Sequence, residues 1–251
     1  MWKWINKNIM NVKFTIEYKG TNFCGWQIQK EQASIQGEIT KAFKMLFPSE
    51  NINVVGSGRT DAGVHSKGQI ASLKLPRSIN LDDTFKSING IISNDIFIKD
   101  YIWVDDDFNA RFSATERTYK YYIINQFSPF LVDTHWFVRF NLDFDMLQRC
   151  SEALIGKKDF SGLSKNNPNI KNHICNVYKS FWEKSNNGLI YTIKANRFLH
   201  HMVRFIVGSS IQVASRKMEF EYFLKMIKNQ SNMSPFCAPS KGLFLHEVKY
   251  D

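Results

Sequence analysis

Two stretches of the chain alternate between apolar and polar residues, and this pattern restricts the fold more than any other. Val12, Phe14, Ile16 and Tyr18 are separated by polar residues, and residues 243–250 alternate in a similar way. Such alternation places the apolar side chains on one face of a half-buried strand. The sequence therefore predicts a β-strand in each of these two stretches, which lie far apart along the chain.

Other segments carry the spacing of helices or shorter strand signals. Residues 35–46 have helical spacing, with Ser34 placed to cap the start and Pro48 beyond the end. Further helices are predicted over residues 85–92, 146–155, 198–213 and 218–228, the third helix of the chain being capped by Gly156. Further strands are predicted over residues 52–55, 71–75, 96–104 and 118–124, and on both sides of Asn187-Gly188, a strong hairpin signal.

These elements predict the fold class and its division. Strands and helices mix without regular alternation and hairpins are present, so we expect an α+β fold with largely antiparallel sheets and not a doubly wound fold. The acidic run Asp105–Asp107 is a plausible boundary, because its carboxylates are costly to bury. Two α+β halves are therefore predicted, over residues 1–107 and residues 108–251.

Basic residues outnumber acidic ones, which favours a polyanionic partner. Thirty-three Lys and Arg oppose 23 Asp and Glu, and the formal charge is +10. The charges are scattered along the chain, so any anion-binding surface has to be assembled by folding. The alternative at this stage is a protein that is basic without such a partner.

Cysteine usage and hydropathy limit the cellular compartments in which we expect the protein. The four cysteines lie far apart, with neither a C-x-x-C pair for zinc nor a dense disulfide framework. We therefore expect reduced thiols in a cytoplasmic, soluble protein. No apolar run approaches the roughly 18 residues of a membrane-spanning helix, and the first residues lack the apolar core of a secretory signal. The residues before Met10 are interpreted as a short extension or as the product of an early start site.

The segment GSGRTDAGVHSKGQ, residues 56–69, lies between two predicted strands and admits three interpretations. A phosphate-binding loop is the first interpretation, but the glycine spacing is not that of a dinucleotide-binding or P-loop motif. No helix follows whose N-terminus could attract the phosphate. A tight turn in which Asp61 caps its own backbone is the second. The third is chemical: Arg59 lies two residues from Asp61, and a carboxylate near a guanidinium stays ionised and can act as a nucleophile.

The same segment, together with four others, resembles a known family. GRTDAGVHSKGQ is similar to the signature loop of the tRNA pseudouridine synthase A family. Similar in order and spacing to that family are also YKGTNFCGWQIQ with SIQGEI, FNARFSATERTYKYYI, RFLHHMVRFIVG and APSKGLFLHEVKY. The resemblance covers most of the chain after Met10.

The resemblance implies a site, a reaction and an assembly. It makes Asp61 the catalytic nucleophile, places Tyr119 against the target base with Arg117 before it, and pairs Arg204 with the catalytic Asp. It further implies two α+β halves around a central catalytic cleft, a homodimer, and chemistry that uses neither metal nor organic cofactor. In the implied reaction a uracil leaves its ribose nitrogen bond, turns and rejoins through carbon, at about positions 38 to 40 in the anticodon arm of tRNA.

Several assignments stay open on sequence alone. Arg59 is inferred to contact phosphate or to displace the flipped base, and a loop-stabilising role is equally plausible. Asp61 can attack either the sugar or the base, and Gly58 and Gly63 are interpreted as the clearance that lets a flipped uridine reach it. A non-catalytic RNA-binding module is the rival function, but a binder has no need of an ionised Asp in this setting.

Residues outside the motif loop are interpreted more simply. His200 and His201 are adjacent, so on the predicted helix they would point about a hundred degrees apart and could not form an i, i+4 metal pair. The segment DFSGL, residues 159–163, has Leu where the family usually has an aromatic, so contacts to the tRNA elbow are expected to differ. Interpreted as the core face of the predicted helix are Phe198, Met202, Phe205 and Ile206. Candidate groove residues, each otherwise a solvated surface charge, are Arg139, Lys157, Lys158, Lys165, Lys171 and Arg197.

Overall fold

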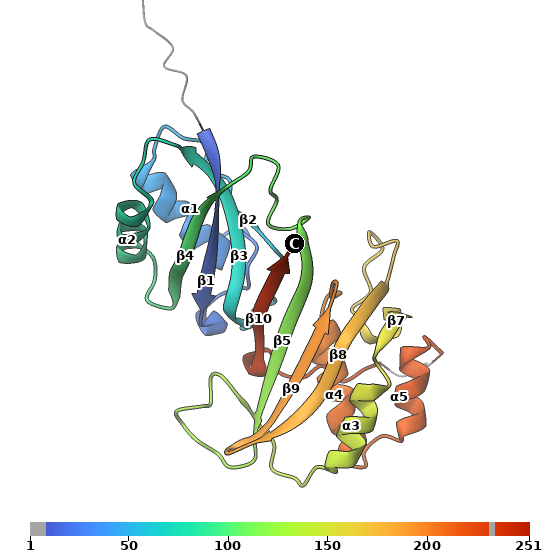
Figure 1. Ribbon diagram of the computed structural model, residues 1–251. Coiled ribbons are helices and arrows are strands. Elements are labelled where there is room, and N and C mark those ends of the chain that lie inside the picture. The colour runs from blue at the N-terminus through green and yellow to red at the C-terminus, as the bar shows by residue number, and fades with distance from the viewer. Residues whose placement is uncertain (1–8, 231–233) are drawn as a thin grey trace, which may run out of the picture. The chain divides into compact units, whose positions relative to one another are not determined.

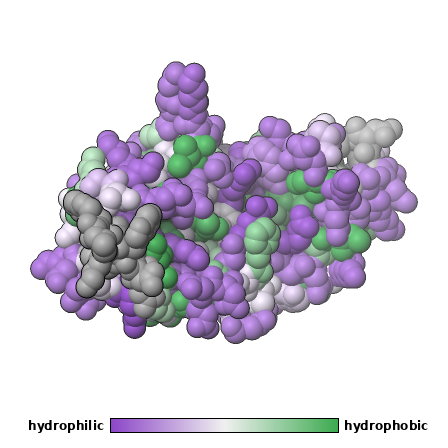
Figure 2. Space-filling model, turned by 90° about the horizontal axis from the view of Figure 1, so that it is seen from above, coloured by the Kyte–Doolittle hydropathy of each residue, from purple (hydrophilic) through white to green (hydrophobic). Residues whose placement is uncertain are grey.

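The computed structural model describes residues 9–230 and 234–251, and it divides the chain into two compact units. Unit 1 contains the residues up to Ala114 together with Tyr250 and Asp251, and unit 2 contains Thr115–Lys249. The residues before Ile9, interpreted above as part of an extension, lie outside the described residues. Within the described part, no helix is long and apolar enough to cross a bilayer. The face shown in Figure 2 is mostly hydrophilic, with hydrophobic side chains in separate patches.

The sheet of unit 1 has the strand order β4-β1-β3, and both pairings are antiparallel. A short strand, β2, pairs antiparallel with β3 on its other side. The strands are β1 (Ile9–Tyr18), β2 (Val55–Gly56), β3 (His65–Pro76) and β4 (Ile96–Val104). The strand predicted from alternation over residues 12–18 and the strand predicted over residues 96–104 are thus confirmed.

Two helices cover one face of this sheet (Figure 1). They are α1 (Ile35–Leu46) and α2 (Leu81–Ile91), with a single 3-10 turn, η1 (Gly20–Asn22), after β1. The Oγ atom of Ser34 accepts a hydrogen bond from the Gly37 N–H, so the predicted cap is confirmed. Between helices and sheet, the rings of Phe14, Phe43 and Phe85 pack against one another with centroids 5.5 to 6.0 Å apart.

The strands around the motif segment differ from the prediction over residues 52–55 and 71–75. Of the first run only Val55 is in a strand, and β3 begins at His65, six residues before the predicted start. The cause is that the pairing of β3 with β1 extends down to Ser66, opposite Tyr18. The segment interpreted as a loop over residues 56–69 is therefore a loop only over residues 57–64.

The sheet of unit 2 has the strand order β10-β5-β9-β8-β7. The pairs β5–β9, β8–β9 and β7–β8 are antiparallel, and the two-residue strand β6 adds to β5 in parallel. The strands are β5 (Ala114–Ile124), β6 (Trp136–Phe137), β7 (Gly156–Asp159), β8 (Ile174–Ser185), β9 (Gly188–Ala195) and β10 (Leu243–Tyr250). The predicted hairpin at Asn187-Gly188 and the strand over residues 243–250 are confirmed, as is the α+β class with largely antiparallel sheets.

Three helices belong to unit 2: α3 (Phe144–Glu152), α4 (Met202–Ala214) and α5 (Phe220–Ile227). Single 3-10 turns lie at η2 (Ser161–Leu163) and η3 (Ser240–Gly242). Gly156 does not cap α3, because the helix ends at Glu152 and Gly156 is the first residue of β7. The helix predicted from residue 198 begins only at Met202, because His201 has a left-handed backbone with φ of 61°, which a helix cannot include.

Candidate active site

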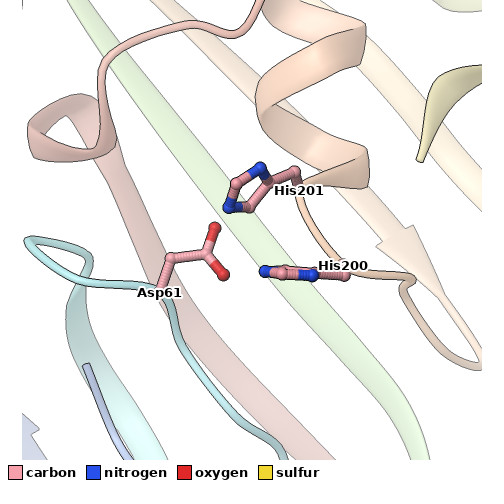
Figure 3. A group of neighbouring side chains, drawn as sticks. All are labelled: Asp61, His200 and His201. Atoms are coloured by element: carbon pink, nitrogen blue, oxygen red, sulfur yellow. The ribbon is translucent and has the colours of Figure 1, made fainter. Parts of the chain in front are cut away.

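The loop over residues 57–64 connects β2 to β3 and carries Arg59, Thr60 and Asp61. At its start, the Ser57 N–H donates a hydrogen bond of 2.8 Å to the Ile70 carbonyl. At its end, the Val64 N–H donates a bond of 3.1 Å to the Asp61 carbonyl, which closes a turn. Thr60 is buried, whereas Asp61 is half-buried, and Figure 3 shows the Asp61 side chain projecting from its loop. The loop therefore anchors the residue before Asp61 and leaves the Asp61 carboxylate partly accessible.

Buried polar side chains from β1 and β3 hold the loop from beneath. The Tyr18 hydroxyl lies 2.8 Å from Thr60 Oγ1, and both residues are buried. Burial raises the pKa of Tyr18 well above its usual range, so this phenol stays neutral. Gln69 accepts a hydrogen bond of 2.6 Å from the Ser57 hydroxyl and donates one of 2.9 Å to the Gly58 carbonyl. The loop is thus fixed at Ser57, Gly58 and Thr60.

The chain after β1 holds the same loop from the other side. The Trp26 N–H donates to the Thr60 carbonyl at 3.1 Å, and the Gly63 N–H donates to the Phe23 carbonyl at 3.2 Å. Gly25 has φ of 90°, and a Cβ there would overlap the Thr60 carbonyl oxygen. Only glycine permits this conformation and this close approach. The backbone of residues 23–26 is therefore part of the support for Asp61.

The first residue of β3 adds a further connection. His65 is fully buried, and its Nδ1 accepts a hydrogen bond of 3.0 Å from the Gly20 N–H. A ring nitrogen that accepts a hydrogen bond carries no proton, so this histidine is neutral with its proton on Nε2. It joins the end of the Asp61 loop to η1.

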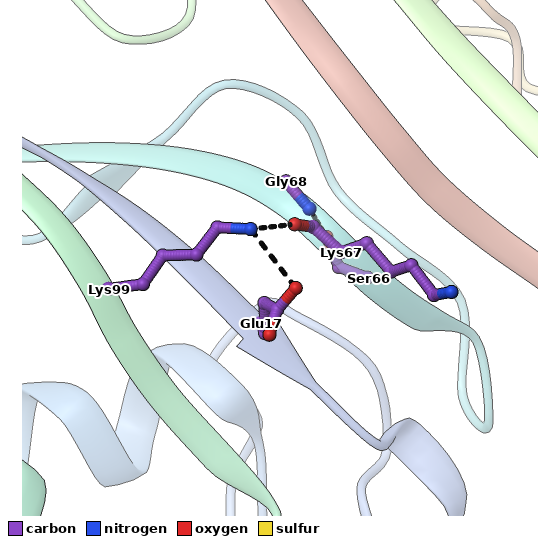
Figure 4. Close-up of polar contacts among 5 residues, drawn as sticks. All are labelled: Glu17, Ser66, Lys67, Gly68 and Lys99. Carbon is purple, nitrogen blue, oxygen red and sulfur yellow. Dashed lines mark hydrogen bonds and ion pairs between the residues drawn. The ribbon is translucent and has the colours of Figure 1, made fainter.

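Surface contacts also join the strands beside the loop. Lys99 on β4 donates to Glu17 Oε1 on β1 at 3.0 Å and to the Lys67 carbonyl on β3 at 2.8 Å (Figure 4). Next to it, the Gly68 N–H donates to the Ser66 hydroxyl at 3.1 Å. Because the Lys99–Glu17 pair is partly exposed, it contributes little to stability, but it bridges all three long strands of unit 1 near the start of β3.

Arg59 and the two loop glycines have different surroundings. The exposed Arg59 donates from Nε to Gln27 Oε1 at 3.1 Å. Gly63 has φ of 75°, in the left-handed region that favours glycine, whereas a Cβ added to Gly58 would meet no atom within 4 Å. Gly63 is thus needed for the backbone, and Gly58 is not needed for packing within this chain.

Tyr119, predicted to face the target base, lies on β5 of unit 2 opposite Ile193. Its half-buried ring meets that of Phe198 edge-on, with centroids 5.0 Å apart and planes at 85°. Two residues earlier, Arg117 Nη1 donates to the Asn196 carbonyl at 2.8 Å. Phe198, predicted to lie in the core of a helix, instead precedes α4 and supports Tyr119.

Arg204, predicted to pair with the catalytic Asp, is a half-buried residue in the first turn of α4. Its Nε donates to the Ala238 carbonyl at 2.8 Å, and the Ala238 N–H donates back to the Arg204 carbonyl at 3.1 Å. The neighbouring Tyr121 hydroxyl donates to the Pro239 carbonyl at 2.7 Å. Burial raises the pKa of Tyr121, and the positive charge of Arg204 offsets part of that increase. The segment before η3 therefore holds the guanidinium group of Arg204 through its Nε atom.

The two adjacent histidines lie just before α4 and not within it (Figure 3). The rings of His200 and His201 lie close, with centroids 4.2 Å apart, so the prediction that they diverge on a helix is wrong. The left-handed backbone at His201 turns the chain and brings the rings together. The His200 carbonyl also accepts a hydrogen bond of 2.9 Å from the Lys165 N–H, which ties the Lys- and Asn-rich segment after η2 to the start of α4.

The other basic candidates are surface residues. Lys158 is half-buried, donates to the carbonyls of Ala153 and Ile155, and has its pKa lowered by burial. Arg197 is half-buried as well. Exposed to solvent are Arg139, Lys157, Lys165 and Lys171. Sequence reasoning missed the supporting roles of Tyr18, Gln69 and Gly25. The second glycine of YKGTNFCGWQ, Gly25, was nevertheless a signal for a close backbone approach.

Comparison with known proteins assigns the chain to a family. A family model described as tRNA pseudouridine synthase matches residues 151–251. Proteins named tRNA pseudouridine synthase A are similar over nearly the whole length. The one from Dictyoglomus thermophilum is 39% identical over 96% of this chain and 100% of its own length. Those from Finegoldia magna and Caldicellulosiruptor bescii are 34% and 36% identical, each over 96% of this chain and 99% of their own length. The chain therefore belongs to the tRNA pseudouridine synthase A family.

Proposed function

We propose that this protein is a tRNA pseudouridine synthase that isomerises uridine to pseudouridine in the anticodon stem-loop, at about positions 38 to 40. Near-full-length similarity to proteins with that name supports the reaction class. The observation that carries the site is the loop of residues 57–64, whose backbone is held on both sides while Asp61 stays half-buried. The substrate positions come from the family resemblance.

Asp61 is the nucleophile in this proposal. Uridine and pseudouridine are isomers: the bond from the ribose C1′ to N1 of uracil breaks, a bond from C1′ to C5 forms, N1 gains a proton and C5 loses one. The isomerisation involves no net oxidation or reduction, so it requires no redox cofactor, and the family resemblance implies that no metal takes part. An ionised carboxylate can attack C1′ of the sugar or the uracil ring, and both routes fit this site.

Tyr119, Arg204 and Arg59 act on the substrate or on Asp61. Tyr119 stacks on the target base, a contact worth about 1 to 3 kcal/mol, which offsets part of the cost of taking the base out of its stem. Arg204 pairs with the Asp61 carboxylate, as the family resemblance implies. Arg59 contacts phosphate or replaces the flipped base. Its contact with Gln27 is equally compatible with a role in stabilising the loop.

The catalytic proposal assigns one role to each predicted half. Residues 1–107 supply the nucleophile, and residues 108–251 supply Tyr119 and Arg204. We infer a cytoplasmic location from the tRNA substrate and from the wide spacing of the four cysteines along the chain.

A homodimer is part of the proposal, and the segment after β5 supports it. Phe130 is 94% exposed and Phe127 is 62% exposed, although the ring of Phe127 also packs on that of Phe137 at 5.7 Å. Large exposed aromatics are typical of interface residues. We expect Phe130→Asp to shift the protein toward monomer in sedimentation velocity, with Phe97→Asp, at another exposed Phe, as the control. Equal self-association of both variants would remove this segment from the interface.

One substitution separates catalysis from the rival function of RNA binding without reaction. Because the hydrogen on C5 is lost, tRNA carrying tritium at C5 of uridine releases tritium as the reaction proceeds. Asp61→Asn should abolish this release while tRNA affinity stays within about tenfold, since few phosphate contacts are lost. The exposed acidic residue Asp106 gives the matched control, Asp106→Asn. Tritium release by Asp61→Asn at the native rate would show that the nucleophile is another group.

A further inference from the structure

Gln69 is a fully buried amide beneath the Asp61 loop, with 0% of its surface exposed. Its Oε1 accepts from the Ser57 hydroxyl at 2.6 Å, and its Nε2 donates to the Gly58 carbonyl at 2.9 Å. A buried amide is costly unless both of its ends are hydrogen-bonded. Here both ends bond to the two residues that immediately precede Arg59, so this side chain sets where the loop leaves the sheet.

We propose that Gln69 is a positioning residue for the nucleophile, acting through the Ser57 hydroxyl and the Gly58 carbonyl. Tyr18 provides the second anchor, through its 2.8 Å contact with Thr60. The two anchors lie on either side of Arg59, and Asp61 follows directly after the second. The inference rests on the proposed function, in which the carboxylate of Asp61 attacks the substrate.

The amide acts on geometry and not on substrate binding. Because Gln69 is covered, it cannot touch RNA, and its removal leaves the exposed loop residues in place. A displacement of about 1 Å at the reacting group lowers the rate by about a hundredfold. Loss of the Gly58 contact is therefore expected to lower kcat with little change in KM.

A change of one atom at this position tests the inference. Gln69→Glu replaces the N–H donor by an oxygen that faces the Gly58 carbonyl. At pH 8.5 the carboxylate repels that carbonyl, and kcat should fall by about ten- to a hundredfold, with KM for tRNA within about threefold. Burial raises the pKa of a carboxyl group, so at about pH 6 the protonated form donates to the Gly58 carbonyl again. The ratio of variant kcat to native kcat should therefore rise as the pH falls.

Two further variants complete the design. Gln69→Met keeps the shape and removes both hydrogen bonds, so its kcat should be low at every pH. Gln230→Glu makes the same chemical change at an exposed position and should keep native kcat throughout. Thermal unfolding of each variant at each pH shows that the measured chains are folded. If Gln69→Glu does not fold, Ser57→Ala removes the donor to Oε1 and should lower kcat by about three- to tenfold.

The outcomes distinguish this inference from the function on which it rests. Native kcat for Gln69→Met, or a low kcat for Gln69→Glu that does not rise as the pH falls, overturns the positioning role; where Ser57→Ala is the variant measured, native kcat does the same. If these results occur while Asp61→Asn is inactive, the nucleophile stands and only Gln69 is excluded. Activity in Asp61→Asn overturns the proposed function itself.

Discussion

Gly25→Ala should damage the fold and the reaction together, because Gly25 lies against Thr60, which precedes the proposed nucleophile Asp61. Its φ of 90° is a conformation that costs an alanine about 1 to 3 kcal/mol. The added Cβ would overlap the Thr60 carbonyl oxygen, so the bond from the Trp26 N–H to that oxygen would lengthen. The Gly25 carbonyl also accepts from the Ile35 N–H at the start of α1, and each such bond contributes about 1 kcal/mol.

Together these effects amount to about 3 to 5 kcal/mol, or a fall in Tm of about 6 to 20 °C for a chain of this size. Differential scanning fluorimetry measures the shift, and single-turnover tritium release measures the rate. Gly58→Ala is the matched control, because a Cβ there meets no atom within 4 Å and its Tm should stay within about 2 °C. An equal loss of Tm in both variants, or native Tm and rate in Gly25→Ala, would refute the argument that residues 23–26 support the loop.

Three further predictions concern binding, thiols and the target base. Binding of tRNA should weaken steeply with added salt because phosphate contacts release counterions, and a flat affinity in a filter-binding titration would contradict a polyanionic partner. Burial raises the pKa of Cys150 to about 12 and that of Cys175 to about 11. At pH 8 both thiols should therefore react with a disulfide reagent only after unfolding. Rapid labelling of either thiol, detected by mass spectrometry, would contradict their burial. Phe198→Leu removes the edge-on support of Tyr119, worth about 0.5 to 1.5 kcal/mol, and should lower kcat about two- to tenfold; an unchanged rate would show that Tyr119 needs no such support.

Where local sequence decides the structure, the sequence predicted it well. The strands predicted over residues 96–104 and 243–250 have the same bounds as β4 and β10, and each begins with buried apolar residues at alternate positions. Ser34 caps α1 because a serine oxygen at that point satisfies a helix N–H with no tertiary help. The spacing of these residues contained the information.

Where distant residues decide the structure, the prediction was wrong or incomplete. The helix expected from residue 198 loses its first turn to the left-handed backbone of His201, which its apolar spacing does not reveal. The early start of β3 depends on pairing with β1, far away in the sequence. For the same reason Gln69 was grouped with the loop, although it is the buried strand residue on which the loop rests. The motif indicated Asp61, but the side chains that hold it come from two other segments.

The last strand residue of the described chain, Tyr250, belongs with the N-terminal unit. Its hydroxyl donates to the Ala110 carbonyl at 2.7 Å, its ring packs on Phe108 at 5.0 Å, and the Lys13 ammonium lies over both rings. A ribosome makes unit 1 first, yet these contacts can form only after all of unit 2 has been synthesised. The unit that carries Asp61 therefore stays incomplete during translation, and a prematurely terminated chain would carry Asp61 on an unfinished unit.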